Sequence, residues 1–513
     1  MADAKRRPQN GGPANRVLGS HADRERTLER LQSETFDLLV IGGGVIGARI
    51  ALEATMAGAR VAMVDAGDFA GATSSASSKL IHGGLRYLQM YDFKLVREAH
   101  AERRALLDRL APHLVTPLTF VLPVYKGGPH RAPTIAAGML AYAAMSGFRH
   151  SRAGMLRPQG ARKLVPSIKT QGMVAAGVYA DAQTYDARLV LATVTAAARA
   201  GAAVLNYTKI TGLDVGGGRV VAAHAGDLRI SCRSVINAAG PWVDAVRLME
   251  DAGAKPMARL SKGAHLVLEP PEDWPWQAAL TTPLEGGRVS FAIPWEGMLL
   301  LGTTDTDYEG DPAAVKADPQ DVDQILSEAG TSLPSEVLAR DRIRYTFAGL
   351  RVLARSEGST AETPREEVIR VGPAGMVSVA GGKLTTHREI ALKVLQELEP
   401  FRQARLTSNP LPGAGPLPLR PAEVAPDVWK HLTHLYGDEA PLVVHTGRLE
   451  PIHPHGTDVW GQVLHAIDQE WAVTVDDIVR RRTTLEIRGQ ATPEVRQAMA
   501  QMMADAGKAP VAR

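Results

Sequence analysis

Short apolar runs separated by longer amphipathic stretches indicate a mixed α/β chain. The apolar runs Leu38 to Ile41 and Val61 to Val64 flank a segment with the periodicity of a helix. Similar short runs recur at Ala203 to Asn206, Ser234 to Ala238 and Met376 to Ala380. Together they predict one parallel sheet that is assembled from segments far apart in the chain.

A second set of runs predicts a different kind of sheet. Ala264 to Glu269, Val289 to Pro294 and Met298 to Thr303 alternate or are rich in β-branched residues, as antiparallel strands are. We expect this mostly antiparallel sheet to form a substrate domain.

A segment rich in Pro and Gly follows. After it, the helical patterns of Trp460 to Trp471 and Val475 to Arg481 predict a small helical C-terminal domain.

The predicted domains are therefore interleaved. The sequence predicts a disordered tail at residues 1–34, a dinucleotide-binding domain, a substrate domain, a linker at 406–421 and a helical domain at 422–513. The dinucleotide-binding domain takes residues 35–115, 170–255 and 345–400. The substrate domain takes 116–169 and 256–344.

Composition narrows the class of protein. The chain has 513 residues, which is enough for two or three domains, and a formal charge of +3 with 22% charged residues. No basic surface for nucleic acid is implied. Cys232 is the single cysteine, so an internal disulfide and a cysteine-based metal cluster are excluded, and no metal site is expected. A reducing compartment is the simplest inference from this cysteine content. Residues 1–34 lack the apolar core of a secretory signal, which suggests a cytosolic protein.

The segment 132–148 (APTIAAGMLAYAAMSGF) is the most apolar stretch of comparable length, but alanine and glycine dilute it too far for a transmembrane helix. Basic residues flank it on both sides. An apolar helix with basic flanks suits a membrane surface that carries anionic lipid. A buried helix with solvated ends is an equally open alternative.

A glycine motif follows the first predicted strand. Gly42, Gly44 and Gly47 have GxGxxG spacing, which permits a tight turn, a close approach to a pyrophosphate and close packing of the following helix. Asp65 ends the second strand, where a carboxylate can accept hydrogen bonds from a ribose hydroxyl. The spacing predicts a dinucleotide site. The alternative is a glycine-rich turn in an ordinary α/β domain, which leaves Asp65 unexplained.

A Ser-rich loop and a second glycine turn favour a flavin over a nicotinamide. The hydroxyls of Ser74, Ser75 and Ser78 can bond a large polar ligand, and Gly83 and Gly84 let the chain pass close to a flat ring. A solvated loop is the alternative. We also expect the backbone to approach the cofactor closely at three further glycines, namely Gly240, Gly381 and Gly382. Plain turns or helix caps are the alternative at these positions.

The motifs GGGVIGARIALEA, ATSSASSKLIHGGLRYL, NAAGPWVD, SKGAHLVL, IPWEGMLLLGTTDTDY, FAGLRVL and VAGGKLTTHREIA resemble those of the FAD-dependent glycerol-3-phosphate dehydrogenases. The resemblance covers roughly residues 36–395, and it extends to the helical C-terminal domain. It implies a discontinuous Rossmann-like FAD-binding domain of the D-amino-acid-oxidase and glutathione-reductase type, beside an antiparallel substrate sheet. It also implies oxidation of sn-glycerol 3-phosphate to dihydroxyacetone phosphate, with electrons passed to membrane quinone, and peripheral association with the inner face of the cell membrane.

The resemblance implies roles for particular residues. Arg86, Arg351, Arg365 and Lys383 stand in family motifs and are expected to converge over the flavin to bind the substrate phosphate, with Tyr87 closing the pocket. Cofactor contacts are expected from a further group of residues: His82, Lys383, Leu384 and Thr385.

Hydride transfer from carbon 2 of the substrate requires a base for the hydroxyl proton. His265 in KGAH is the first candidate, with Arg351 stabilising the developing alkoxide. His82 in IHGG is the alternative base.

Alternative functions stay open. An oxidase of the same fold could use oxygen and act on glycerol 3-phosphate or on an amino or hydroxy acid, and the motifs do not distinguish oxygen from quinone. A non-enzymatic FAD-bearing subunit is a third alternative, which the intact His265, Arg351 and Lys383 disfavour. A homodimer is one open mode of assembly.

Overall fold

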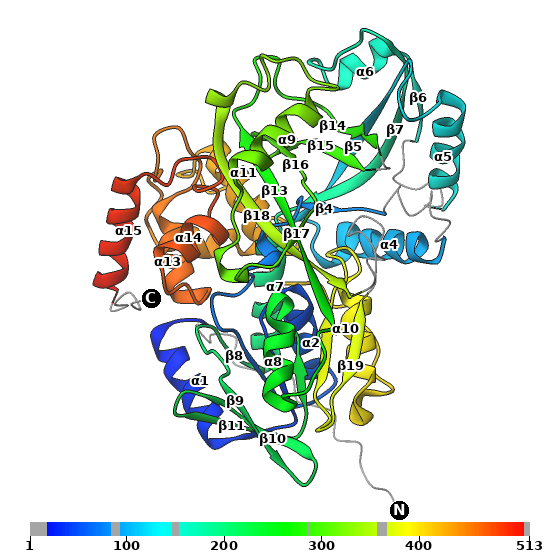
Figure 1. Ribbon diagram of the computed structural model, residues 1–513. Helices are drawn as coiled ribbons and strands as arrows, with labels where there is room; N and C mark the ends of the chain where they lie inside the picture. Colours follow the sequence, from blue (N-terminus) through cyan, green and yellow to red (C-terminus); the bar gives the residue numbers. More distant parts are fainter. Residues whose placement is uncertain (1–17, 84–92, 146–152, 286–287, 356–366, 507–513) are drawn as a thin grey trace, which may run out of the picture.

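A computed structural model describes residues 18–83, 93–145, 153–285, 288–355 and 367–506. This part of the chain contains two large sheets and a group of C-terminal helices. In Figure 1 the smaller sheet lies in the lower half and the larger sheet in the upper half, while the orange and red C-terminal segment lies beside both.

The lower sheet has six strands in the order β19-β20-β12-β2-β3-β8. Neighbouring strands are parallel except at the edge, where β19 and β20 are antiparallel. The predicted parallel sheet is therefore confirmed. Its strands are β2 (Leu38–Ile41), β3 (Val61–Val64), β8 (Ala203–Leu205), β12 (Val235–Asn237), β19 (Val368–Val371) and β20 (Val377–Ala380).

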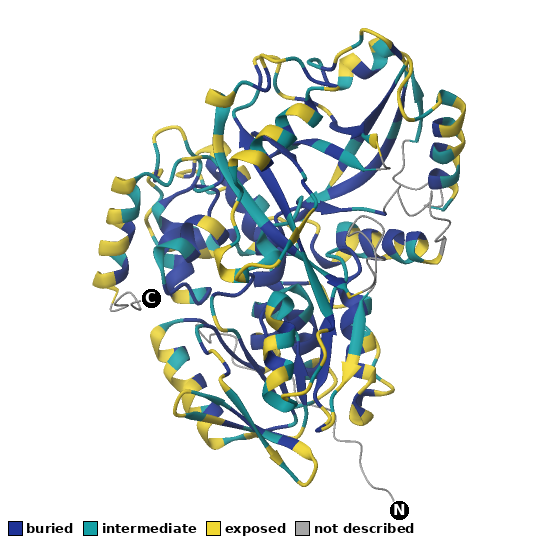
Figure 2. Ribbon diagram, viewed as in Figure 1, coloured by how far each residue is buried: buried dark blue, intermediate teal, exposed yellow. Residues whose placement is uncertain are grey.

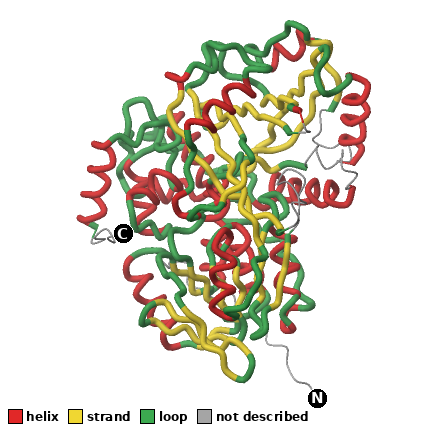
Figure 3. Tube along the Cα trace, viewed as in Figure 1, coloured by secondary structure: helices red, strands yellow, loops and turns green. Residues whose placement is uncertain are grey.

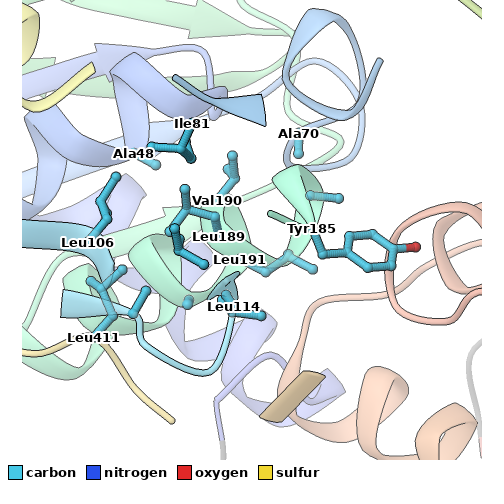
Figure 4. Close-up of a cluster of buried hydrophobic side chains, with 14 of the residues drawn as sticks. Ala48, Ala70, Ile81, Leu106, Leu114, Tyr185, Leu189, Val190, Leu191 and Leu411 are labelled. Carbon is cyan, nitrogen blue, oxygen red and sulfur yellow. The ribbon is translucent and has the colours of Figure 1, made fainter. Parts of the chain in front are cut away.

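Both faces of this sheet are covered, so its central strands are buried along their whole length. Leu38 and Val40 point to a layer of helices, whereas Leu39 and Ile41 point to the opposite layer. Figure 4 shows Leu189 and its neighbours packed within the helical layer. That layer consists of α2 (Val45–Met56), α7 (Asp186–Ala200) and α10 (His387–Gln396).

The opposite layer contains a small sheet and two helices: β1 (Thr35–Phe36), β9 (Gly212–Gly216), β10 (Arg219–Ala225), β11 (Leu228–Cys232), α1 (His21–Ser33) and α8 (Val243–Glu250). Helix α1 differs from the predicted disordered tail. The hydroxyl of Ser20 caps it by accepting a hydrogen bond from the Asp23 N–H at 3.2 Å. Thr27 and Leu31, four residues apart, are buried. The prediction followed the polar composition and overlooked this narrow buried stripe.

The upper sheet has ten strands, and its neighbours are antiparallel except for the β14 and β5 pair. The prediction of a mostly antiparallel second sheet is confirmed. Its strands are β4 (Leu80–Ile81), β5 (Val115–Tyr125), β6 (Gly154–Leu156), β7 (Met173–Thr184), β13 (Ala258–Leu268), β14 (Ala279–Pro283), β15 (Val289–Trp295), β16 (Met298–Gly302), β17 (Thr306–Tyr308) and β18 (Ile343–Ala354). Figure 3, with strands in yellow, shows the long central strands extending down toward the lower sheet.

Besides the short strand β4, two long strands belong to another domain than the one predicted for them. Strands β7 and β18 belong to the upper sheet, although the prediction placed residues 170–184 and 345–354 in the dinucleotide-binding domain. β7 is rich in alanine and has no clear alternation of apolar and polar residues. β18 pairs with β13 over nearly its whole length. Long-range pairing, which local pattern does not encode, sets both boundaries.

Helices pack on both faces of the upper sheet, because alternate residues of β5 fall into different apolar clusters: Val121 with Ile325, and Phe120 with Ile135. Ile325 and Ala329 pack with Ala264, Leu266 and Leu301 in one apolar cluster. The helices around this sheet are α4 (Phe93–Ala105), α5 (Ala132–Met145), α6 (Pro158–Leu164) and α9 (Pro319–Ala329). Among helices of the described residues, none combines the length and apolar character needed to cross a membrane.

Buried ion pairs join the C-terminal helices to the lower domain. Arg481 and Arg482 form ion pairs with Asp68 of the lower domain, and Arg188 pairs with Glu470 at 2.5 Å. Figure 2 shows dark, buried segments on the inner side of this helical group. The two helical patterns predicted from the sequence are confirmed. The helices are α11 (Pro426–Tyr436), α12 (Ala440–Val444), α13 (Trp460–Gln469), α14 (Val475–Arg481) and α15 (Pro493–Asp505).

Candidate active site

The turn between β2 and α2 is built by close backbone packing. Gly42 has a φ of +108°, and a β-carbon there would lie 2.5 Å from the carbonyl oxygen of Ala238 at the end of β12. A β-carbon on Gly47 would overlap the Gly42 carbonyl oxygen, so α2 can start this close only with glycine. Gly44 is the N-cap and offers no side-chain oxygen to the first-turn N–H groups. First-turn N–H groups of this kind can bind an anion, so the start of α2 is a candidate anion site.

Asp65 lies at the end of β3 and holds two backbone turns. Its Oδ2 accepts a hydrogen bond from the Gly43 N–H at 2.6 Å, and its Oδ1 accepts one from the Gly67 N–H at 2.8 Å. Burial raises the pKa of Asp65 to about 6, although both hydrogen bonds favour the charged form. A carboxylate has about four lone-pair positions, so the ionised group can still accept hydrogen bonds from a ribose.

The serines of the loop after β3 have different partners. The Ser74 hydroxyl accepts a hydrogen bond from the Val45 N–H at 3.0 Å, in the first turn of α2. The Ser77 hydroxyl donates to one Asp186 oxygen at 2.7 Å, and the Lys79 ammonium donates to the other at 2.7 Å. Asp186, at the start of α7, therefore anchors the loop, while Ser74 lies at the anion site.

Two predicted flavin-facing segments meet directly. The His82 N–H donates to the Thr385 hydroxyl oxygen at 3.1 Å, and the Thr385 hydroxyl lies 3.3 Å from the His82 carbonyl. The Gly83 N–H donates to the buried Asp181 at 3.0 Å. The glycine pair 381–382 has positive φ angles and precedes half-buried side chains at 383 and 384. The structure thus brings residues 82–83 and 381–385 together, although some 300 positions separate them.

One face of the upper sheet lies against the Ser-rich loop. The Thr73 hydroxyl donates to the Leu350 carbonyl at 2.7 Å. A β-carbon on Gly349 would lie 2.8 Å from the carbonyl oxygen of Ala76, so the loop rests directly on β18. Pairing of β13 with β18 sets the residues of this face opposite one another: Ser261 and Arg351, Gly263 and Gly349, His265 and Phe347.

His265 is enclosed within this face and is 3% exposed. Its Nε2 lies 2.9 Å from the Ser78 hydroxyl oxygen, and its ring stacks on Phe347 at 4.8 Å with an interplanar angle of 10°. On β16, a β-carbon at Gly302 would lie 3.0 Å from the His265 Cγ, so the imidazole occupies the space that a side chain there would need.

The imidazole of His265 is neutral in this setting. Burial is the largest cause that holds its pKa well below the ordinary histidine value, and the positive charges of Arg351 and Lys79 act in the same direction. A neutral imidazole has one nitrogen able to accept a proton, as a base requires.

Arg351 is held by the turn that follows β16. Its guanidinium donates to the Thr303 hydroxyl at 3.0 Å and to the Thr304 carbonyl at 3.0 and 3.1 Å, and it pairs with Asp305 at 3.3 Å. Across the sheet, a β-carbon on Gly263 would lie 2.5 Å from the guanidinium. Arg351 is therefore a fixed positive charge near His265.

These residues fit an FAD molecule. The first turn of α2 can hold a pyrophosphate, and Asp65 can hold the ribose, as their geometry above shows. Gly240 has a φ of +56° and follows β12, whose end touches the Gly42 turn. The joined segments at residues 82–83 and 381–385 provide a second, separate contact region, as a long flavin cofactor requires.

Residues 37–388 match the family described as FAD dependent oxidoreductase, and residues 378–509 match the C-terminal domain of alpha-glycerophosphate oxidase. The chain belongs to the FAD dependent oxidoreductase family. Its cofactor is FAD, and the fold predicted from the sequence is confirmed.

Relatives of this FAD dependent oxidoreductase cover most of its length. A glycerol-3-phosphate dehydrogenase from Synechocystis sp. is 34% identical over 504 residues, which is 90% of each chain. An aerobic glycerol-3-phosphate dehydrogenase from Staphylococcus haemolyticus is 37% identical and covers 74% of this chain and 70% of its own. The glycerol-3-phosphate dehydrogenase of Bacillus halodurans complexed with FAD superposes with a TM-score of 0.74 at 27% identity, covering 96% of this chain and 92% of that one.

The remaining predicted site residues lie partly within and partly outside the described part of the chain. The Ser75 hydroxyl donates a hydrogen bond to the Ala72 carbonyl of its own loop at 3.4 Å. Lys383 and Leu384 lie beside Thr385 in the second contact region. Four predicted residues lie outside the described residues: Gly84, Arg86, Tyr87 and Arg365.

Sequence reasoning overlooked two residues that hold the site in shape. Asp186 anchors the Ser-rich loop, and Asp181 accepts a hydrogen bond from Gly83. The GTTD segment, in contrast, was recognisable by its position after a predicted strand, and the carbonyl of its Thr304 accepts hydrogen bonds from Arg351. Asp181 and Asp186 lie in segments without a chemical motif, so only the long-range contacts reveal them.

Proposed function

We propose that the protein oxidises sn-glycerol 3-phosphate to dihydroxyacetone phosphate and passes the electrons to quinone. The observation that carries this proposal is the similarity to proteins named glycerol-3-phosphate dehydrogenase over nearly the whole chain, 34% over 90% of it in one case. The arrangement of His265 and Arg351 beside the FAD-binding loop supports the same reaction.

The proposal gives each residue a defined task. FAD, when bound, supplies the oxidant by accepting a hydride at flavin N5. His265 receives the proton of the carbon-2 hydroxyl, and Arg351 stabilises the negative charge that develops on that oxygen. Lys383 contributes to phosphate binding. Arg86, Tyr87 and Arg365 are assigned to the same substrate pocket by their positions in the sequence motifs.

Oxygen is the second candidate acceptor. The C-terminal residues 378–509 match a domain that is described from an oxidase. Both acceptors are compatible with the same reductive half of the reaction, because the flavin is reduced before it meets either of them.

The outer face of α5 supports a membrane-surface location. Leu140 is 65% exposed, and Ala137 and Ala144 on the same side are also exposed. Lys126 and Arg131 precede the helix, where they can meet anionic lipid headgroups. We propose that this face rests on the membrane that contains the quinone.

The acceptor is tested with purified holoenzyme and sn-glycerol 3-phosphate. Dihydroxyacetone phosphate should form in step with reduction of a short-chain quinone in the absence of oxygen. Hydrogen peroxide production at a comparable rate in air, with no quinone reduction, would favour the oxidase.

Flotation with anionic vesicles tests the membrane location. Leu140→Asp should reduce binding to the vesicles, whereas Leu419→Asp, at a 95% exposed leucine of the linker, should not. Equal flotation of both variants would contradict a role for α5.

A further inference from the structure

Neither ring nitrogen of His265 is open to a bound substrate. Nε2 is occupied by the Ser78 hydroxyl at 2.9 Å, and Nδ1 is buried without a hydrogen-bond partner. Phe347 covers one ring face, and the backbone at Gly302 lies against the ring edge. If His265 takes up the substrate proton, the proton has to arrive through the group that already contacts Nε2.

Ser78 is placed to be that group. The Ser78 hydroxyl lies at hydrogen-bond distance from Nε2 of His265. Ser78 is half-buried, whereas His265 is buried. Along the chain it lies between Ser74, at the anion site of α2, and His82, at the second contact region. A hydroxyl can donate one hydrogen bond while it accepts another, as a proton carrier must.

We propose that Ser78 is a catalytic residue that transfers the substrate proton to His265. This inference rests on the proposed function, in which His265 is the base, and adds the route by which the substrate proton reaches His265. The substrate O–H bond breaks and its proton passes to Ser78 Oγ, while the Ser78 O–H bond breaks and its proton passes to His265 Nε2. Bound FAD would accept the carbon-2 hydrogen with its electron pair, so that the carbon–oxygen double bond forms.

The surroundings of His265 agree with this direction of transfer. The proposed transfer requires the tautomer in which Nε2 accepts a hydrogen bond from the Ser78 hydroxyl and Nδ1 carries the hydrogen. Arg351 and Lys79 disfavour a lasting positive charge on the ring, so the ring releases the proton through Ser78 to solvent water once product has left.

The test compares two substitutions of nearly equal shape. Ser78→Thr keeps the hydroxyl, and Ser78→Val replaces it by a methyl group and excludes a substitute water. The rate of anaerobic flavin reduction by sn-glycerol 3-phosphate should fall about 100-fold or more in Ser78→Val and stay within about tenfold in Ser78→Thr. Thr282→Val, which loses a hydroxyl on buried β14 of the same sheet, is the control and should reduce at the wild-type rate.

A solvent isotope measurement separates proton transfer from orientation. In mixtures of water and deuterium oxide, the wild-type reduction rate should depend on the deuterium fraction with the curvature of two moving protons. Equal rates in Ser78→Thr and Ser78→Val, or a linear isotope dependence, would overturn the transfer through Ser78 while leaving the proposed oxidation intact. Failure of glycerol 3-phosphate to reduce the wild-type flavin would instead overturn the proposed function, and the transfer with it.

Discussion

The cofactor region and the substrate face differ in what builds them. Backbone groups form the cofactor region, where Gly42, Gly44 and Gly47 allow contacts that a side chain would block. Side chains form the substrate face, where His265 and Arg351 lie on paired strands and are held by residues of other segments. Glycine spacing is therefore visible in a sequence, whereas a side-chain arrangement depends on strand register. The difference predicts that substitutions in the two regions will fail in different ways.

The largest effect is expected at the glycine turn, because a variant that loses FAD loses all of its activity. Gly47→Val should abolish stable FAD binding, with a dissociation constant raised at least about 100-fold, because overpacking of about 3 kcal/mol forces α2 away from the turn. Fluorescence titration of the apoprotein with FAD measures this. Gly212→Val is the matched control, because a β-carbon at Gly212 meets nothing within 4 Å. Normal FAD affinity in Gly47→Val would contradict the close-packed turn.

The substrate face should lose activity while it keeps the cofactor. Arg351→Gln should lower kcat/KM for glycerol 3-phosphate by about 10²- to 10³-fold, because the neutral amide stabilises the developing alkoxide less well. FAD content, read from the absorption spectrum, should stay at the wild-type level. Arg344 is an exposed arginine on the same strand as Arg351, and it pairs with Glu269. Arg344→Gln should therefore leave kcat/KM unchanged. Loss of FAD from Arg351→Gln would remove the distinction between the two regions.

A smaller, pH-dependent effect is expected at Asp65. Because the pKa of Asp65 is raised from 3.8 to about 6 in the folded protein, this group stabilises the apoprotein at low pH, and that contribution is lost as the pH rises through 6. FAD binding should show the opposite trend, since ribose hydroxyls need the ionised carboxylate. Affinity for FAD should increase about tenfold from pH 5 to pH 7.

Asp65→Asn supplies the check on that trend. The amide does not titrate, so FAD affinity of this variant should be nearly independent of pH over the same interval. A pH dependence that persists unchanged in Asp65→Asn would assign the titration to another group.

The same contrast explains which predictions succeeded. The strands of the lower sheet and the glycine turn were predictable, because apolar runs and glycine spacing act locally. The placement of β7 and β18 in the upper sheet was not predictable, because long-range pairing sets it. β7 pairs with β5, and β18 pairs with β13. The contact between Ser78 and His265 joins residues 187 positions apart, and no local pattern encodes it.

Anaerobic titration of the holoenzyme with sn-glycerol 3-phosphate is the most direct test of the proposed oxidation. We expect full bleaching of the oxidised flavin band by sn-glycerol 3-phosphate, and no bleaching by glycerol, which lacks the phosphate that the cations bind. Dihydroxyacetone phosphate should appear in equal amount to the reduced flavin. An unchanged flavin spectrum after excess sn-glycerol 3-phosphate would contradict the proposed oxidation.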